Sequence, residues 1–163
     1  MPVVATLVVG RDGSTTKGGR SSGVTSAIDR QTFLARRRSV DCIIIGGNTA
    51  RSEPYQRTPV PVVVLSRSMV NTLAHNRRAH WWNCSISDAL VRAKRLFGEN
   101  ILIEAGPQLI LESVNHNLID VLELSVTDID GGENVIDYRA LLETFARVEE
   151  KIVDGTHFFT AQK

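Results

Sequence analysis

The amino-acid sequence predicts an α/β domain built as a three-layer αβα sandwich, with helices covering both faces of a mostly parallel sheet. Three uninterrupted apolar runs, at residues 43–45, 62–65 and 101–103, are typical of strands buried on both faces. Segments with helical spacing separate these runs, as the crossovers of a parallel sheet require. Near the end of the chain, Asp154-Gly155 joins two strand-like runs and predicts an antiparallel hairpin.

The expected strands are apolar or alternating runs bounded by turn residues. A shorter run at 79–82 also fits a strand, and the glycine-rich segment 10–23 is expected to be a loop. The remaining strands are expected at residues 3–9, 41–45, 62–65, 101–103, 122–126, 148–153 and 156–160.

The expected helices begin at residues that can accept a hydrogen bond from the first helical turn, or at a proline. They end near a glycine, an asparagine or a proline. They run from a cap at Thr25 or Ser26 to Arg38, from Thr49 to Pro54, from a cap at Ser87 to Gly98, from Pro107 to His116, and from a cap at Asp137 to Phe145.

Length, charge and cysteine content exclude several classes of protein. The chain is long enough for one domain with a real core, spanning residues 1–163. A net charge of +1 provides no field that would recruit nucleic acid or an anionic membrane. No apolar run approaches the roughly 18 residues of a membrane span, and no signal peptide is apparent, so we expect a cytoplasmic protein. Two cysteines without metal-ligand spacing indicate reduced thiols and no metal site.

The most informative segment follows the strand expected at 41–45. Gly46 and Gly47 allow a sharp turn and a close backbone approach to a ligand, and Asn48 or Thr49 can cap a helix. A strand, a glycine turn and a helix N-terminus together expose backbone N–H groups that favour bound phosphate.

Two further segments end strands in the same way. Glu104, Ala105, Gly106 and Pro107 form a second glycine turn, and Ser66-Arg67 closes the strand expected at 62–65. Because parallel strands end at one edge of their sheet, we expect the three segments to meet and bind a dinucleotide. An arginine beside a serine suits a 2′-phosphate and favours NADPH over NADH, although Arg67 also fits a solvated turn.

Other polar residues have both a structural and a functional interpretation. Asp12 fits an Asp-Gly turn, and Asp29 suits the first turn of a helix or the N–H edge of a pyrimidine. Ser21 and Thr25 are either caps or substrate contacts. The run at 36–38 fits a solvated helix end, although one arginine, Arg37 among them, could instead reach a substrate phosphate.

Taken in order, these motifs resemble the reductase domain of riboflavin biosynthesis, which occurs alone and as the C-terminal half of bifunctional deaminase-reductases. That domain has the fold of dihydrofolate reductase. The resemblance rests on Asp12-Gly13, Gly19-Arg-Ser21-Ser-Gly-Val24-Thr25, Asp29, Arg37, Asp41-Cys-Ile-Ile-Ile-Gly46-Gly47-Asn48-Thr49, Glu104-Ala105-Gly106-Pro107, Leu118-Ile-Asp120-Val121 and Gly131-Gly132. Separately, Val64-Leu65-Ser66-Arg67 resembles the strand end that holds the NADPH 2′-phosphate in dihydrofolate reductases, and Asp29 with Phe33 resembles their substrate-binding acid and aromatic residue.

The resemblance implies an NADPH-dependent, homodimeric reductase that transfers a hydride to ribose C1′ of a phosphorylated ribosylamino-pyrimidine. It implies a cofactor site made of Gly46, Gly47, Asn48, Thr49, Ser66, Arg67, Glu104, Ala105, Gly106 and Pro107. On the substrate side it implies Asp12 and Asp29 as catalytic residues, with Asp12 the candidate proton donor, and contacts from Ser21, Thr25 and Arg37.

Several residues depart from the family pattern, and the cofactor half matches it better than the substrate half. Ser14 replaces a usual lysine, Gly23 an aromatic residue, Leu34 a histidine, and Glu53-Pro54 an Asp-Pro pair. Two alternatives therefore stay open: a dihydrofolate-reductase-like reductase of another heterocycle, and an NADPH-binding module without catalysis.

Overall fold

A computed structural model describes residues 2–104 and 106–163 of the chain. The strands are β1 (Val3–Val9), β2 (Cys42–Gly46), β3 (Val62–Leu65), β4 (Ala79–Trp82), β5 (Ile101–Glu104), β6 (Val121–Val126), β7 (Arg147–Val153) and β8 (Thr156–Gln162). The helices are α1 (Ala27–Arg37), α2 (Gly47–Ser52), α3 (Ile86–Phe97), α4 (Pro107–Asn115) and α5 (Tyr138–Glu143), with a 3-10 turn at Ser21–Gly23. All these strands join one sheet in the order β4-β3-β2-β5-β1-β6-β8-β7.

The strand directions confirm the predicted mixed sheet. Strands β1 to β6 pair in parallel, whereas β8 pairs antiparallel with both β6 and β7. Asp154 and Gly155 connect β7 to β8 with φ angles of 49° and 79°. A two-residue turn with both φ angles positive matches the twist of its strands, which explains why Asp-Gly at this position predicts the hairpin.

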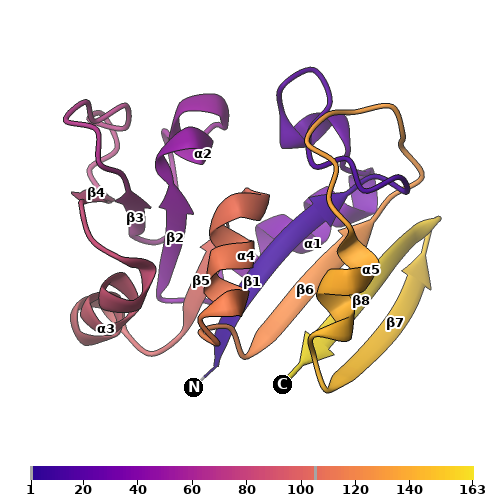
Figure 1. The fold of residues 1–163 in the computed structure, drawn as a ribbon. Helices are drawn as coiled ribbons and strands as arrows, with labels where there is room; N and C mark the ends of the chain where they lie inside the picture. Colours follow the sequence, from indigo (N-terminus) through magenta and orange to yellow (C-terminus); the bar gives the residue numbers. More distant parts are fainter. Residues whose placement is uncertain (1, 105) are drawn as a thin grey trace.

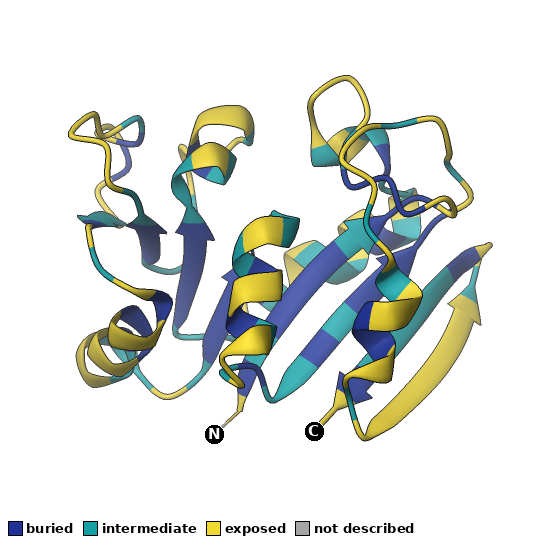
Figure 2. Ribbon diagram, viewed as in Figure 1, coloured by how far each residue is buried: buried dark blue, intermediate teal, exposed yellow. Residues whose placement is uncertain are grey.

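The sheet separates two apolar cores, as a three-layer domain requires. Helix α1 lies behind the sheet in Figure 1, and α3, α4 and α5 lie in front of it. Within β2, Ile44 belongs to the core that contains α3 and α4, whereas Ile43 and Ile45 belong to the opposite core. All three isoleucines are completely buried, which confirms a strand covered on both faces (Figure 2).

Most helix boundaries match the predictions, but two helix caps do not. The prediction that Asn48 or Thr49 caps α2 is wrong, because α2 begins at Gly47 and its N-cap is Gly46. Ser26 Oγ accepts a hydrogen bond from Asp29 N at 3.2 Å, and Asp137 caps α5 as predicted. The prediction that Ser87 caps α3 is wrong, because Ser85 Oγ accepts the bond from Asp88 N at 3.1 Å. An earlier start places Ile86 in the first turn, where its side chain packs in the core. Helix α5 also ends at Glu143, earlier than predicted.

The described ranges, with Met1 and Ala105 left aside, contain no helix with the length and hydropathy needed to cross a membrane. They also contain no group of three or more histidine, cysteine or acidic side chains arranged to hold a metal ion. Cys42 and Cys84 are both free thiols. Burial raises the pKa of Cys42 to about 12, so this thiol is an unreactive part of the core.

Candidate functional site

The carboxyl ends of the parallel strands open into a cavity of about 720 Å³. Its volume lies within the range typical of ligand pockets. Ala105, which we also expect in the cofactor site, lies outside the described residues. Every other residue of the three predicted segments lines the cavity: Gly46, Gly47, Asn48, Thr49, Ser66, Arg67, Glu104, Gly106 and Pro107. The fold therefore brings together three segments that are far apart in the sequence.

Gly47 allows the β2–α2 turn and the end of β3 to approach each other closely. A Cβ atom on Gly47 would lie 2.9 Å from Ser66 Oγ and 3.2 Å from Arg51 Nη1. Arg51, one helical turn after Gly47, also donates a hydrogen bond to Asn48 Oδ1 and lines the cavity. Sequence reasoning missed Arg51, although its i+4 spacing from Gly47 is the signal that could have found it.

Gly106, in the second glycine turn, lies beside the first turn at the cavity. Gly106 is the N-cap of α4 and Pro107 occupies the first turn, as the sequence predicts. A Cβ built on Gly106 would lie 3.9 Å from Thr49 Oγ1, in van der Waals contact, so Gly106 lies close to the β2–α2 turn. Glycines from both turns thus border the same cavity.

A buried ion pair links α1 to the end of β5 at this cavity. Arg37 Nε lies 2.9 Å from both carboxylate oxygens of Glu104, and their side chains are 9% and 2% exposed. The interpretation of 36–38 as a solvated helix end is therefore wrong for Arg37, because folding turns this residue onto the sheet. Arg36 also turns inward and donates to Thr6 Oγ1 at 2.8 Å, whereas Arg38 is exposed.

Two aromatic rings complete the surroundings of Arg37. Its guanidinium carbon lies 4.5 Å from the ring centroid of Phe33 and 4.8 Å from that of Tyr55, within cation–π range. Burial works to lower the pKa of Arg37, but Glu104 outweighs it and holds the pKa above its ordinary value. Burial raises the pKa of Glu104, and Arg37 opposes that rise. Tyr55 was not predicted, since it lies in a polar segment without periodicity.

Both hydrogen bonds from Arg37 to Glu104 come from Nε. The two terminal nitrogens are therefore not used by the carboxylate. Because Arg37 lines the cavity, its guanidinium is a fixed cation at the cavity wall.

Asp29 is a buried carboxylate at the α1 side of the cavity. Its side chain accepts a hydrogen bond of 2.5 Å from Thr25 Oγ1, and the residue is 8% exposed. Asp29 and Ser21 line the cavity, but Thr25 does not and contacts it only through Asp29. Phe33, one turn after Asp29, lines the same wall.

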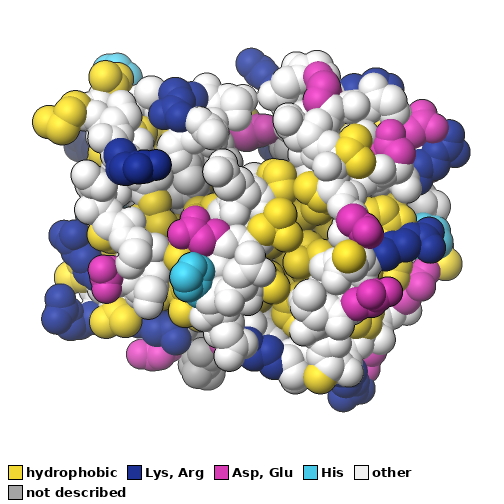
Figure 3. Space-filling model, viewed as in Figure 1, with side chains coloured by type: hydrophobic (Ala, Val, Ile, Leu, Met, Phe, Trp, Pro, Cys, Tyr) yellow, Lys and Arg dark blue, Asp and Glu magenta, His cyan; other side chains and the backbone are white. Residues whose placement is uncertain are grey.

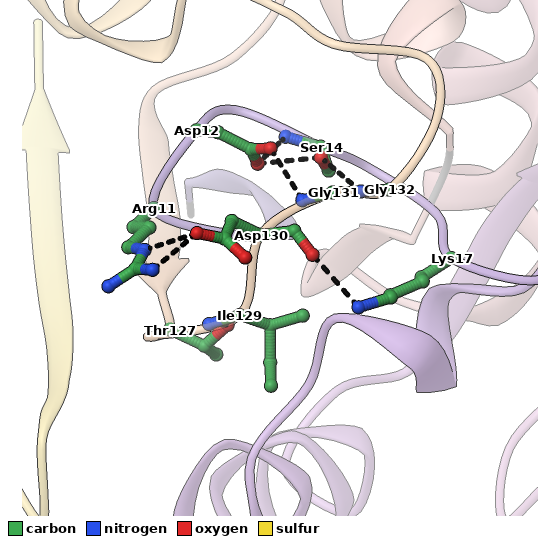
Figure 4. Close-up of polar contacts among 9 residues, drawn as sticks. All are labelled: Arg11, Asp12, Ser14, Lys17, Thr127, Ile129, Asp130, Gly131 and Gly132. Atoms are coloured by element: carbon green, nitrogen blue, oxygen red, sulfur yellow. Dashed lines mark hydrogen bonds and ion pairs between the residues drawn. The ribbon is translucent and has the colours of Figure 1, made fainter.

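Asp12 does not line the cavity, and its carboxylate holds two loops together (Figure 4). It accepts hydrogen bonds from Ser14 N at 3.0 Å, Ser14 Oγ at 2.6 Å and Gly131 N at 2.9 Å. Arg11 and Lys17 add contacts to Asp130 in the same pair of loops. The Ser14 hydroxyl, the Ser14 N–H and the Gly131 N–H lower the pKa of Asp12 to about 2. Such a group is ionised at neutral pH and is a poor proton donor.

We expect Asp12→Asn to destabilise the fold in a pH-dependent manner. The folded-state pKa is below the ordinary value, so the carboxylate stabilises the fold above about pH 4, and this contribution disappears as the pH falls toward about 2. The difference in unfolding free energy between wild type and Asp12→Asn should be constant near neutrality and shrink over that range. Urea unfolding at a series of pH values measures it. The control is Asp128→Asn, an exposed aspartate in the same region; an equal response would contradict the assignment.

The sheet order and the cavity at its carboxyl edge define an α/β domain of the dihydrofolate-reductase-like class, with a site suited to a nucleotide-sized ligand. The family model described as RibD C-terminal domain matches residues 2–129. The chain therefore belongs to the RibD C-terminal domain family, as the motifs predict.

Solved structures share this fold at low sequence identity. One is a diaminohydroxyphosphoribosylaminopyrimidine deaminase/5-amino-6-(5-phosphoribosylamino)uracil reductase from Thermotoga maritima, with a TM-score of 0.77 and 14% identity. The alignment covers 98% of this chain and 56% of the Thermotoga chain. Another is a putative riboflavin biosynthesis protein from Shewanella sp. PV-4, with a TM-score of 0.75, 20% identity, and coverage of 99% and 98%. No curated protein shows a significant sequence match.

Proposed function

We propose that this chain is an NADPH-dependent reductase of a phosphorylated ribosylamino-pyrimidine, acting in the cytoplasm as a homodimer. The observation that carries the proposal is the convergence of two glycine turns and Ser66-Arg67 on one cavity, in a member of the RibD C-terminal domain family. The substrate class follows from the reductase activity named for the Thermotoga structure, of which this chain spans 56%.

The cavity has the features that NADPH requires. Gly47 and Gly106 present backbone without side chains, so a pyrophosphate can approach the backbone of Gly46–Thr49 and of Gly106 closely. Ser66 and Arg67 would hold the 2′-phosphate, and Arg51 beside Ser66 adds a second cation. NADPH, when bound, supplies the hydride that reaches ribose C1′.

The substrate would lie against α1. Asp29, held by Thr25, would accept hydrogen bonds from the N–H edge of the pyrimidine, and Ser21 would contact a substrate hydroxyl. Arg37 would bind the substrate phosphate through the terminal nitrogens that Glu104 leaves unused. We assign Asp12 a structural role, since it holds the loops rather than the cavity wall.

A second candidate is reduction of another heterocycle, and one observation favours it. Asp29 and Phe33 lie together on the cavity wall, which is the arrangement that resembles the substrate site of dihydrofolate reductases. A carboxylate beside an aromatic face binds many planar rings that carry N–H donors. The choice of ring therefore depends on the assay below.

Calorimetric titration with NADPH and NADH tests the cofactor assignment. We expect NADPH to bind at least about tenfold more tightly, because only NADPH offers a phosphate to Ser66 and Arg67. Turnover is then followed as NADPH oxidation, separately with a phosphoribosylamino-pyrimidine and with dihydrofolate. Oxidation with dihydrofolate alone favours the second candidate. Binding without oxidation by either substrate indicates a non-catalytic module, and the absence of NADPH binding overturns the proposal.

A further inference from the structure

Strand β7 forms an open edge of the sheet at the end opposite β4 (Figure 1). Arg147 to Ile152 are all exposed and only Val153 is half-buried, so nearly all of β7 is exposed to solvent (Figure 2). Acidic, basic and apolar side chains lie close together at this edge in Figure 3. An open strand edge carries backbone N–H and C=O groups that another strand can bind.

The hairpin determines which backbone groups face outward. Val153 pairs with Thr156 across the two-residue turn, and such flanking residues exchange hydrogen bonds with each other. Hydrogen-bonded and non-hydrogen-bonded positions alternate along an antiparallel pair. The N–H and C=O groups of Val148, Glu150 and Ile152 therefore face away from β8, toward the open edge.

We propose that β7 pairs antiparallel with β7 of a second copy of this chain, about a two-fold axis through Glu150. This inference rests on the homodimer of the proposed function and adds its interface and register. In this register each outward-facing residue of one copy meets an outward-facing residue of the other, and all of β7 is paired. The two sheets become one continuous sheet.

Charge complementarity selects this register over its neighbours. Glu149 accepts a hydrogen bond from Arg147 of its own strand and lies opposite Lys151 of the other copy, so two oppositely charged cross-strand pairs form next to each other. A two-fold axis through Glu149 would instead place Glu149 opposite itself and Arg147 opposite Lys151. An axis through Lys151 would place Lys151 opposite itself and Glu150 opposite Ile152.

The same register covers the exposed apolar residues of β7. Val148 and Ile152 are 41% and 59% exposed. In this register Val148 of each copy would lie opposite Ile152 of the other copy. Glu150 lies opposite Glu150 of the second copy at the two-fold axis. Its Oε1, however, lies 2.7 Å from His157 Nδ1 on β8. The Glu150 carboxylate is thereby drawn away from the open edge.

A charge-reversal series tests the pairing by sedimentation equilibrium across a range of protein concentrations. Glu149→Lys and Lys151→Glu each convert both attractive pairs into repulsive ones, and we expect each to raise the dimer dissociation constant at least about tenfold. The double variant Glu149→Lys/Lys151→Glu restores two attractive pairs and should return to within about threefold of wild type. Glu99→Lys, an exposed reversal between α3 and β5, is the matched control and should have no effect.

The outcomes separate this inference from the proposed function. A wild-type dimer that single reversals leave unchanged uses another surface and overturns the pairing. If both single variants dimerise more weakly and the double variant does not recover the wild-type dissociation constant, the proposed register is wrong. A wild-type monomer at every concentration means that the charged edge only prevents association, and it overturns both the pairing and the homodimer. NADPH titration of each variant is read independently, because no residue of β7 lines the cavity.

Discussion

Replacing Arg37 by methionine is expected to lower the free energy of unfolding by about 3–5 kcal/mol, because it leaves Glu104 buried and ionisable without a countercharge. Glu104→Gln should be destabilising for the same reason, since it leaves the guanidinium of Arg37 buried between Phe33 and Tyr55 without a carboxylate. Urea unfolding at neutral pH measures both losses. The pair connects α1 to β5, and either loss therefore weakens the cavity wall as well as the fold.

The double variant Arg37→Met/Glu104→Gln distinguishes a buried pair from two independent contacts. The double variant leaves no uncompensated charge. Its loss of unfolding free energy should therefore be smaller than the sum of the losses in the two single variants. Arg11→Met is the matched control, because the Arg11–Asp130 pair is 64% and 52% exposed and removing it should cost far less. A loss in Arg37→Met no larger than in Arg11→Met would show that Arg37 is solvated in solution.

Replacing Arg67 by alanine is expected to raise the dissociation constant for NADPH by about 10- to 100-fold and to leave that for NADH nearly unchanged. The magnitude follows from the loss of charge-assisted hydrogen bonds, and the selectivity follows because NADH has no 2′-phosphate. Arg51→Ala should act in the same direction, since Arg51 and Ser66 both lie next to Gly47. Arg67 is exposed, so its removal should not change the melting temperature.

Calorimetric titration of the wild type and of each variant with both cofactors gives the dissociation constants that the comparison needs. Arg57→Ala is the matched control, because this exposed arginine follows α2, the helix that contains Arg51, but does not line the cavity. If Arg67→Ala weakens NADPH and NADH equally, the residue contacts a part that the two cofactors share, and the 2′-phosphate assignment is wrong.

Much of the fold can be predicted from local sequence chemistry. Ile43, Ile44 and Ile45 are β-branched and uninterrupted, which is sufficient to predict a strand covered on both faces. Asp154-Gly155 predicts its turn because both positions need positive φ angles. The cap of α3 was misplaced because Ser85 and Ser87 are chemically equal, and only the packing of Ile86 decides between them.

The meeting of Gly47, Ser66 and Gly106 was also predictable, because the carboxyl ends of parallel strands share one edge of a sheet. The roles of several polar residues could not be predicted from the sequence. The sequence predicts Arg37 at a solvated helix end or on a substrate phosphate, and Asp12 in an Asp-Gly turn or as a proton donor. In the structure, Arg37 is buried against Glu104 and Asp12 holds two loops together. Tyr55 and Arg51 give no strong sequence signal, but both line the cavity.

By itself, then, the sequence determined the elements, their mostly parallel arrangement, the terminal hairpin and the edge at which a ligand would bind. The tertiary structure alone decided which charges are paired, which are free to meet a ligand, and that the β7 edge is open. The physical reason is distance along the chain. Periodicity and turn chemistry act over a few residues, whereas the pairing of Arg37 with Glu104 depends on strand order and helix packing across the whole domain.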